Sequence, residues 1–231
     1  MDLNLLGIIP ARGGSKGLPG KNIKNLNGLP LIAYTIISAI KSKMFSKVIV
    51  NTDDNEIAQI AQKYGAEVPF IRPALLAEDS SSTIDVVKHT INWFEEKNLK
   101  FSTICLLQPT SPLRTDIHIK EAINLFVKKG ADSVISTVEL NHPIYWVKNV
   151  DESGLISDIF NKEESNLNRQ SYRKNVMPNG AIYLFKSDLL KNNSLYTDHS
   201  FSYEMDKKSS IDIDNLDDFE YCEFLLRSRN A

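Results

Sequence analysis

The sequence predicts an α/β fold with a mostly parallel, doubly wound sheet. Short apolar segments alternate with longer amphipathic segments through residues 3–138. This alternation indicates parallel strands joined by helices that cover both faces of the sheet. A glycine-rich loop follows directly after the first apolar segment. Open α/β sheets bind ligands at this position, beyond the carboxyl end of a strand.

The first half of the chain supplies strands and helices in turn. An apolar run predicts a buried strand at 3–9, and apolar positions on one face predict a helix within 31–39. A second buried strand is expected at 47–51 and an amphipathic helix at 54–64. A short edge strand is expected at 68–71, where a proline limits the ladder of hydrogen bonds.

The same pattern continues to the middle of the chain. Ser82 is a candidate N-cap for a helix at 83–96. A buried strand is expected at 103–107, a helix at 115–128 and a further strand at 133–138. Each strand therefore precedes a helix, as in βαβ units.

The alternation ends at about residue 139. Residues 140–178 contain turn-forming residues, aromatic residues and a polar stretch of mixed charge. We interpret them as a small lobe inserted into a single domain that spans 1–231. A strand at 179–185 and a terminal helix at 216–227 complete the prediction.

The composition excludes several classes of protein. The 231 residues are 42% hydrophobic and 24% charged, and the net charge is −2 at pH 7, so we expect neither nucleic acid nor a membrane as partner. The two cysteines, Cys105 and Cys222, are expected to be buried free thiols in a reducing cytosol. With no signal-like segment and no long apolar run, a cytoplasmic location is expected.

The loop after the first strand has the composition of a polyphosphate site. Its glycines allow backbone N–H groups to face an anion, and its cations neutralise the charge. Neither common phosphate signature is present, since Asn22 follows Gly20-Lys21 and Ser15 replaces the second glycine of the dinucleotide fingerprint. The alternative is a solvated basic surface loop. The glycines and cations are Gly13, Gly14, Gly17, Gly20, Arg12, Lys16 and Lys21.

Two carboxylates near the end of the chain form a candidate metal site. Asp212 and Asp214 alternate in an extended segment and so share one face. Mg²⁺ commonly takes one or two carboxylates together with phosphates and waters. The alternative is that Asp214 caps the last helix and Asp212 is solvated.

Two further segments carry candidate substrate contacts. Gln108 follows a buried strand in a proline-shaped loop, where its amide could bind a sugar or a base. The alternative is a plain turn before a helix. Arg169, in the inserted lobe, could bind a carboxylate. For this arginine a solvated basic patch is the better-supported interpretation of the residues alone.

Six motifs occur together in one order. They are ARGGSKGLPGKN at 11–22, NTDD at 51–54, RPALLAEDSSS at 72–82, LLQPTSPLR at 106–114, MPNGAIY at 177–183 and SIDIDNLDD at 210–218. Over nearly the whole chain they resemble the acylneuraminate cytidylyltransferases, the CMP-sialic acid synthetase family. The later motifs differ from those of the related enzymes that act on the eight-carbon acid Kdo.

The resemblance implies a fold of the nucleotide-diphospho-sugar transferase type with a dimerisation lobe at 140–178, and therefore a homodimer. It implies that CTP and a nonulosonic acid are the substrates and that Mg²⁺, or another divalent cation such as Mn²⁺, is the cofactor. The implied reaction transfers CMP to the anomeric hydroxyl of a nine-carbon 2-keto sugar acid and releases pyrophosphate.

The resemblance also assigns roles residue by residue. Asp212 and Asp214 match metal ligands, and Gln108, Arg169 and Tyr183 match substrate contacts. Arg12, Lys21 and Asp212 are the implied catalytic residues. The implied nucleotide-binding residues are Ala11, Arg12, Gly14, Ser15, Lys21, Asn22 and Ser82.

Departures from the family pattern indicate which sugar acid is the expected substrate. Apolar and aromatic residues at 144–146 follow His142-Pro143, where enzymes for N-acetylneuraminic acid commonly carry a lysine, and Leu195-Tyr196 stand near the expected sugar tail. These groups favour a less polar, legionaminic-type sugar (5,7-diacetamido, 9-deoxy). N-acetylneuraminic acid and pseudaminic acid are the alternatives, and a catalytically inactive nucleotide-binding protein is the alternative of another class.

Overall fold

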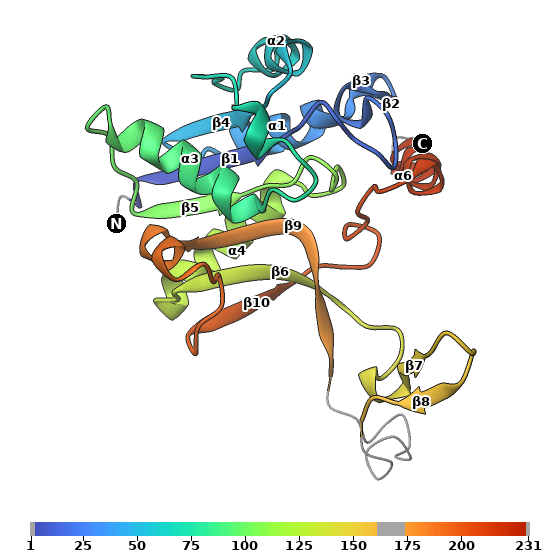
Figure 1. The fold of residues 1–231 in the computed structure, drawn as a ribbon. Helices are drawn as coiled ribbons and strands as arrows, with labels where there is room; N and C mark the ends of the chain where they lie inside the picture. The colour runs from blue at the N-terminus through green and yellow to red at the C-terminus, as the bar shows by residue number, and fades with distance from the viewer. Residues whose placement is uncertain (1–2, 161–173, 230–231) are drawn as a thin grey trace.

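The computed structural model describes residues 3–160 and 174–229, and the predicted α/β architecture is confirmed (Figure 1). Its central sheet has the strand order β10-β6-β9-β5-β1-β4. Only β9 runs antiparallel to its neighbours, so the sheet is mostly parallel. The strands are β1 (Leu5–Pro10), β4 (Lys47–Asn51), β5 (Thr103–Leu106), β6 (Ser133–Glu139), β9 (Val176–Lys186) and β10 (Ser200–Glu204).

Helices cover both faces of this sheet (Figure 1). Leu5 and Ile9 of β1 pack with α1, α2 and α4, whereas Leu6 and Ile8 pack with α3 on the opposite face. This division follows from the alternation of side chains along a strand. The helices are α1 (Leu31–Ser42), α2 (Asn55–Lys63), α3 (Thr83–Glu95), α4 (Asp116–Lys129) and α6 (Leu216–Arg229), with short 3₁₀ turns η1 (Lys21–Ile23), η2 (Ala74–Leu76), η3 (Ile144–Trp146) and η5 (Ser187–Asn192).

A third apolar cluster joins the two ends of the chain. Leu18 of the glycine-rich loop and Leu26 of the small hairpin formed by β2 (Asn25–Leu26) and β3 (Leu29–Pro30) pack there with Ile213 and with Phe219 of α6. The burial of this cluster draws the loop toward the segment that carries Asp212 and Asp214.

Residues 140–160, which follow β6, stand away from the sheet (Figure 1). They contain an antiparallel hairpin of β7 (Lys148–Val150) and β8 (Ile156–Asp158). Within the described residues, no helix has the length and apolar character required to span a membrane.

Two expectations about the sheet were wrong or incomplete. Residues 68–71 do not form an edge strand, because only Glu67 bridges to Ile49 before the chain leaves the sheet. The sequence pattern also missed β10, which pairs in parallel with β6. Cys105 and Cys222 are both buried, and neither forms a disulfide within the described residues, as predicted.

Candidate active site

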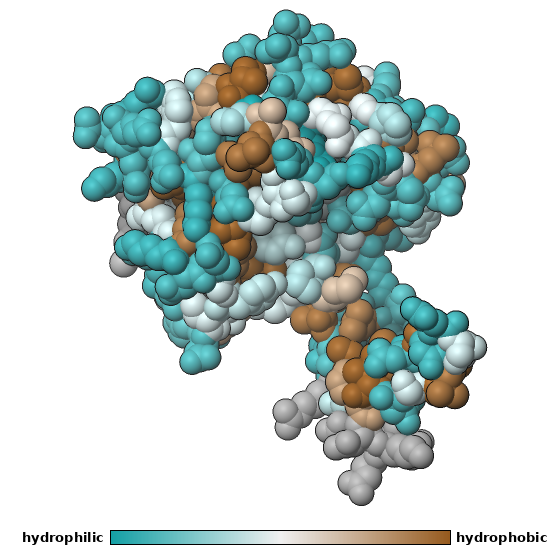
Figure 2. Space-filling view, viewed as in Figure 1, coloured by the Kyte–Doolittle hydropathy of each residue, from teal (hydrophilic) through white to brown (hydrophobic). Residues whose placement is uncertain are grey.

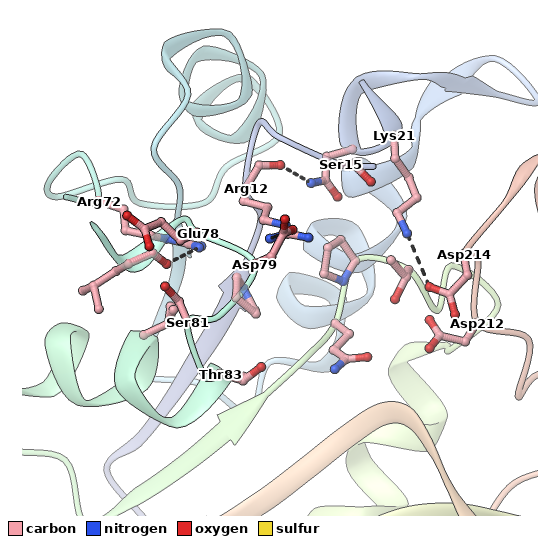
Figure 3. Close-up of a pocket in the computed structure, with 17 residues that line it drawn as sticks. Arg12, Ser15, Lys21, Arg72, Glu78, Asp79, Ser81, Thr83, Asp212 and Asp214 are labelled. Atoms are coloured by element: carbon pink, nitrogen blue, oxygen red, sulfur yellow. Dashed lines mark hydrogen bonds and ion pairs between the residues drawn. The ribbon is translucent and has the colours of Figure 1, made fainter. Parts of the chain in front are cut away.

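A cavity of about 380 Å³ opens at the carboxyl ends of β1 and β5 (Figure 3). Four segments line it: the glycine-rich loop, residues 72–86, residues 108–110, and the segment with the two aspartates. The charged lining residues are Arg12, Lys21, Arg72, Glu78, Asp79, Asp212 and Asp214. Cations and carboxylates therefore converge on one cavity, as a site for a metal-bound polyphosphate requires.

Two hydrogen bonds between side chains and the backbone fix the glycine-rich loop. The Gly13 N–H donates to Asp53 Oδ1 at 3.1 Å, and Asn22 Nδ2 donates to the Arg12 carbonyl at 2.9 Å. Asp54, next to Asp53, caps α2 by accepting from two backbone N–H groups. The NTDD motif therefore anchors both the loop and a helix.

Gly17 allows this loop to approach the acidic segment. A Cβ atom at Gly17 would lie 2.3 Å from the Asp214 carbonyl oxygen, a distance that no side chain tolerates. The absence of a side chain at this position brings the two halves of the site together.

We therefore expect Gly17→Ala to reduce the kcat/KM of a reaction carried out in this cavity by about 10²-fold, because a displacement of about 1 Å in a positioned site costs that much. The melting temperature should also fall. Gly14→Ala is the matched control for stability, since a Cβ atom there meets nothing within 4 Å. Steady-state kinetics and thermal unfolding of both variants test this, and a Gly17→Ala enzyme with wild-type kcat/KM would contradict it.

Lys21 is held between the loop and the acidic segment. Its side chain is almost fully buried, and Nζ donates to the Ile213 carbonyl at 2.6 Å. The same Nζ lies 3.6 Å from Asp214 Oδ1 (Figure 3). This ammonium is fixed in place, with one carbonyl and one carboxylate around it.

The two aspartates differ in environment. Asp214 does not cap the last helix, because Asn215 and Asp218 exchange side-chain and backbone hydrogen bonds at its start. Its side chain is 80% exposed. Asp212 is more deeply placed, and burial raises the pKa of its carboxyl, opposed by a hydrogen bond from Thr110 and reinforced by Asp214.

Asp212 fits the role of a metal ligand. Its Oδ1 is buried and has no hydrogen-bond partner within the described residues. An unpartnered buried carboxylate oxygen is costly unless a cation satisfies it. No cluster of three or more metal-binding side chains occurs in the described parts of the chain. A Mg²⁺ ion commonly takes one or two protein carboxylates and completes its ligand set with phosphates and water.

A second cavity, of about 200 Å³, adjoins the first. Gln108 and Thr83 line both cavities, and Tyr183 lines the second. Burial, followed by the charges of Tyr196 and Asp212, raises the pKa of Tyr183. The remaining lining residues are mostly apolar: Ile84, Val87, Leu106, Phe185, Leu190 and Leu195.

Backbone geometry sets the position of Gln108. Gly180 has a φ of +78°, and a Cβ atom there would lie 2.6 Å from Gln108 Oε1. Arg114 is fully buried and donates to the carbonyls of Gln108, at 3.1 Å, and Ala181, at 3.0 Å. Burial lowers the pKa of Arg114 to about 10. Arg114 therefore ties the loop that follows β5 to the middle of β9.

The predicted site residues fall into three groups. The first lines the first cavity, the second lies beside it, and the third lies outside the described residues. The first comprises Arg12, Ser15, Lys21, Asn22, Gln108, Asp212 and Asp214, with Tyr183 in the second cavity. In the second group, Ala11 N–H donates to the Asn51 carbonyl, Gly14 lies in the loop, and Ser82 caps α3 between the lining residues Ser81 and Thr83. Arg169 forms the third group.

Among the lining residues that were not identified from the sequence, Arg72 forms buried hydrogen bonds and Asp79 forms ion pairs. Arg72 is buried and donates to Asn51 Oδ1 at 2.7 Å, and burial lowers its pKa to about 10. Asp79 binds Arg12 at 2.9 Å and also Lys16. Both belong to the RPALLAEDSSS motif, which was the available signal, but their partners are distant in the sequence.

Several known proteins are similar to this chain in sequence. The cytidylyltransferase family model matches residues 6–229. The chain is 38% identical to an N-acylneuraminate cytidylyltransferase of Escherichia coli O18:K1:H7, over all of this chain and 54% of the relative, so it spans about half of that protein. It is 39% identical to a CMP-N,N'-diacetyllegionaminic acid synthase of Campylobacter jejuni, over 98% of this chain and 96% of the relative.

Among solved structures, the chain resembles a CMP:2-keto-3-deoxy-manno-octonic acid synthetase complexed with CTP, with a TM-score of 0.72. The alignment covers 97% of this chain and 99% of that one at 19% identity, and it therefore shows the shared fold.

Proposed function

Because the chain belongs to the cytidylyltransferase family, we propose that it transfers CMP from CTP to the anomeric hydroxyl of a nine-carbon 2-keto sugar acid and releases pyrophosphate. One observation carries this proposal. Fixed cations of the glycine-rich loop, Arg12 and Lys21, share one cavity with the carboxylates Asp212 and Asp214. A nucleoside triphosphate with a divalent cation complements this charge pattern.

The chemistry follows from positioning and charge. The anomeric hydroxyl attacks the α-phosphorus of CTP in line and loses its proton to the surrounding water, the bond to the bridging oxygen breaks, and pyrophosphate leaves with the electron pair. Such a transfer depends on alignment and charge neutralisation more than on covalent catalysis. Lys21 and Arg12 would stabilise the charge that develops on the leaving pyrophosphate. Gln108, at the junction of the two cavities, would orient the sugar acid.

Asp212 and Asp214 would hold Mg²⁺ or Mn²⁺. The bound ion would supply positive charge near the α-phosphate. The unpartnered Oδ1 of Asp212 supports this assignment. The protein's own contribution is to place the two carboxylates on one side of the cavity, beside Lys21 (Figure 3).

The apolar second cavity supports a legionaminic-type sugar. Leu190, Leu195 and Phe185 would contact the sugar tail without offering it a hydrogen bond. A terminal hydroxyl would lose its hydration there with no replacement, whereas the methyl group of a 9-deoxy sugar would not. N-acetylneuraminic acid, with its polar tail, and pseudaminic acid, with different stereochemistry, are the alternatives.

Pyrophosphate release with each acid separately tests this proposal. With CTP and Mg²⁺, legionaminic acid is expected to exceed N-acetylneuraminic acid by about 10- to 100-fold in kcat/KM, the range for one group in an apolar pocket. Leu195→Ser should narrow this ratio. Leu99→Ser, at an exposed leucine outside both cavities, is the control. A preference for N-acetylneuraminic acid would refute the sugar assignment, and no release with any acid would favour an inactive nucleotide-binding protein.

The protruding lobe supports a homodimer. Val150, Leu155 and Ile156 each expose 66% of their surface on the hairpin, and Figure 2 shows apolar side chains gathered on this lobe. Contiguous exposed apolar residues of this kind mark protein interfaces. A second copy of the chain is the proposed partner.

We expect a solution mass of about twice the 26.1 kDa of the chain, and Ile156→Asp should shift it toward the monomer, since a buried unpaired charge is costly. Light scattering after size exclusion measures this mass. Val127→Asp, at an exposed position of α4, is the control and should stay dimeric. A wild-type chain of monomer mass would contradict the proposal.

A further inference from the structure

Three cations in and near the first cavity pair with two carboxylates. Lys21 lies beside Asp214, whereas Arg12 and Lys16 both bind Asp79. Arg12 Nη1 lies 2.9 Å from Asp79 Oδ1, and Lys16 Nζ binds Oδ2. Each oxygen of one carboxylate therefore takes one cation, and two oxygens of a phosphate group could take the same pair.

Asp79 is presented by an ordered loop. The buried Arg72 donates to the Leu76 carbonyl at 3.4 Å, and the Ser81 hydroxyl donates to the Leu75 carbonyl at 2.8 Å. The first bond lies before Asp79 in the chain, and the second closes the loop around it. The position of its carboxylate in the cavity is consequently part of the fold.

The position of the Asp79 carboxylate is unfavourable for the binding of a polyanion, because it adds a negative charge to the cavity. Four carboxylates and three cations line it, and two of those carboxylates are the proposed metal ligands. Asp79 is not needed for the metal, and it lies at 2.9 Å from a cation that the phosphates would use. The carboxylates are Glu78, Asp79, Asp212 and Asp214, and the cations are Arg12, Lys21 and Arg72.

We propose that Asp79 is an internal competitor of the phosphate groups: its carboxylate binds Arg12 and Lys16, and CTP must break both ion pairs to bind. This inference rests on the proposed function. Asp79 thereby weakens the binding of CTP and of the product pyrophosphate, and it replaces the departing anion on Arg12 and Lys16. It is a positioning residue for two cations, and it touches neither substrate in this role.

Calorimetric titration of Asp79→Asn with CTP, inorganic pyrophosphate and cytidine at fixed Mg²⁺ tests the inference. Exposed ion pairs are individually weak, so the affinities for CTP and pyrophosphate should each rise by about 3- to 10-fold. Cytidine has no phosphate, and its affinity should not change. Asp79→Ala should behave as Asp79→Asn does, with thermal unfolding confirming that each variant is folded.

Glu78→Gln is the matched control. Glu78 lines the same cavity and carries the same charge, but within the described residues it forms no ion pair. It should give a smaller gain than Asp79→Asn. An equal gain would assign the effect to general charge, and unchanged or weaker binding by Asp79→Asn would assign Asp79 to nucleotide binding; both outcomes overturn the inference. If no variant and no wild-type protein binds CTP or pyrophosphate, the proposed function fails as well.

Discussion

Lys21→Met is expected to lower kcat by about 10²- to 10³-fold at saturating CTP, the usual cost of losing one preorganised group that stabilises developing charge. Lys21 is only 9% exposed, and its Nζ is fixed by the Ile213 carbonyl and by Asp214. An ammonium held in this way needs little reorganisation when charge develops on pyrophosphate. Methionine fills a similar volume without the charge, so the main loss should be in turnover.

Lys16→Met is the matched control for this experiment. Its side chain is 81% exposed, and its ion pair with Asp79 is open to solvent. Water screens such a charge, so we expect less than about a 10-fold change in kcat. Steady-state pyrophosphate release over a CTP series measures both variants. A folded Lys21→Met enzyme with kcat close to that of Lys16→Met would remove Lys21 from the proposed mechanism.

The sheet was predictable where local pattern and tertiary structure agree. The apolar runs that became β1 and β5 are buried on both faces, so burial is visible in the sequence itself. The strand β10 has a mixed pattern, and its stability comes from pairing with β6 and from contacts such as Tyr203 with Glu121. These partners are far away in the sequence, and no local pattern reveals them.

At 68–71 the reverse occurs: the local pattern predicts an edge strand, but no strand forms. These residues are moderately apolar, but the chain turns away after Glu67 bridges Ile49. The Arg72 N–H then donates to the Thr52 carbonyl at 2.7 Å. The backbone at this point supports the cavity wall instead of extending the sheet.

In the candidate site, too, contacts between segments that are far apart in the sequence could not be predicted. Arg12, Lys21, Asp212 and Asp214 could be named from motifs, because their residue types and spacing match a polyphosphate and metal site. The pairing of Asp79 with Arg12 joins segments 67 positions apart, and it depends on how the loop folds. The ambiguity over Asp214 was likewise settled by a neighbour, since Asn215 takes the capping role.

Asp212→Asn should have two opposite effects. First, kcat should fall by about 10²-fold or more, and pyrophosphate release should respond much less to Mg²⁺, because the proposed metal loses its buried charged ligand. Second, the metal-free variant should be more stable than the wild type near pH 7. The pKa of the buried Asp212 carboxyl is raised, so its ionised form is less favourable in the folded state than in the unfolded chain.

The pH dependence of this second effect has a definite sign. A raised folded-state pKa contributes stability below the unfolded value of about 3.9, and this contribution is lost as the pH rises through the folded pKa. The wild type therefore carries the cost of the ionised carboxylate at pH 7, and the asparagine variant avoids it. The difference in melting temperature, measured with a chelator present, should be positive at pH 7 and should shrink toward pH 4.

The Asp214→Asn variant separates the effect of losing a metal ligand from the effect of removing a buried charge. The Asp214 side chain is 80% exposed, so its neutralisation should weaken the response to Mg²⁺ without raising the metal-free melting temperature. Added Mg²⁺ should stabilise the wild type by mass action and should stabilise both variants less. If Asp212→Asn kept the wild-type Mg²⁺ response, the carboxylate would not be a metal ligand, and its unpartnered Oδ1 would need another explanation. A buried charge that lowers stability is expected only where binding needs it. The melting temperatures measure the cost of the Asp212 carboxylate to stability, and the Mg²⁺ titrations measure its contribution to metal binding.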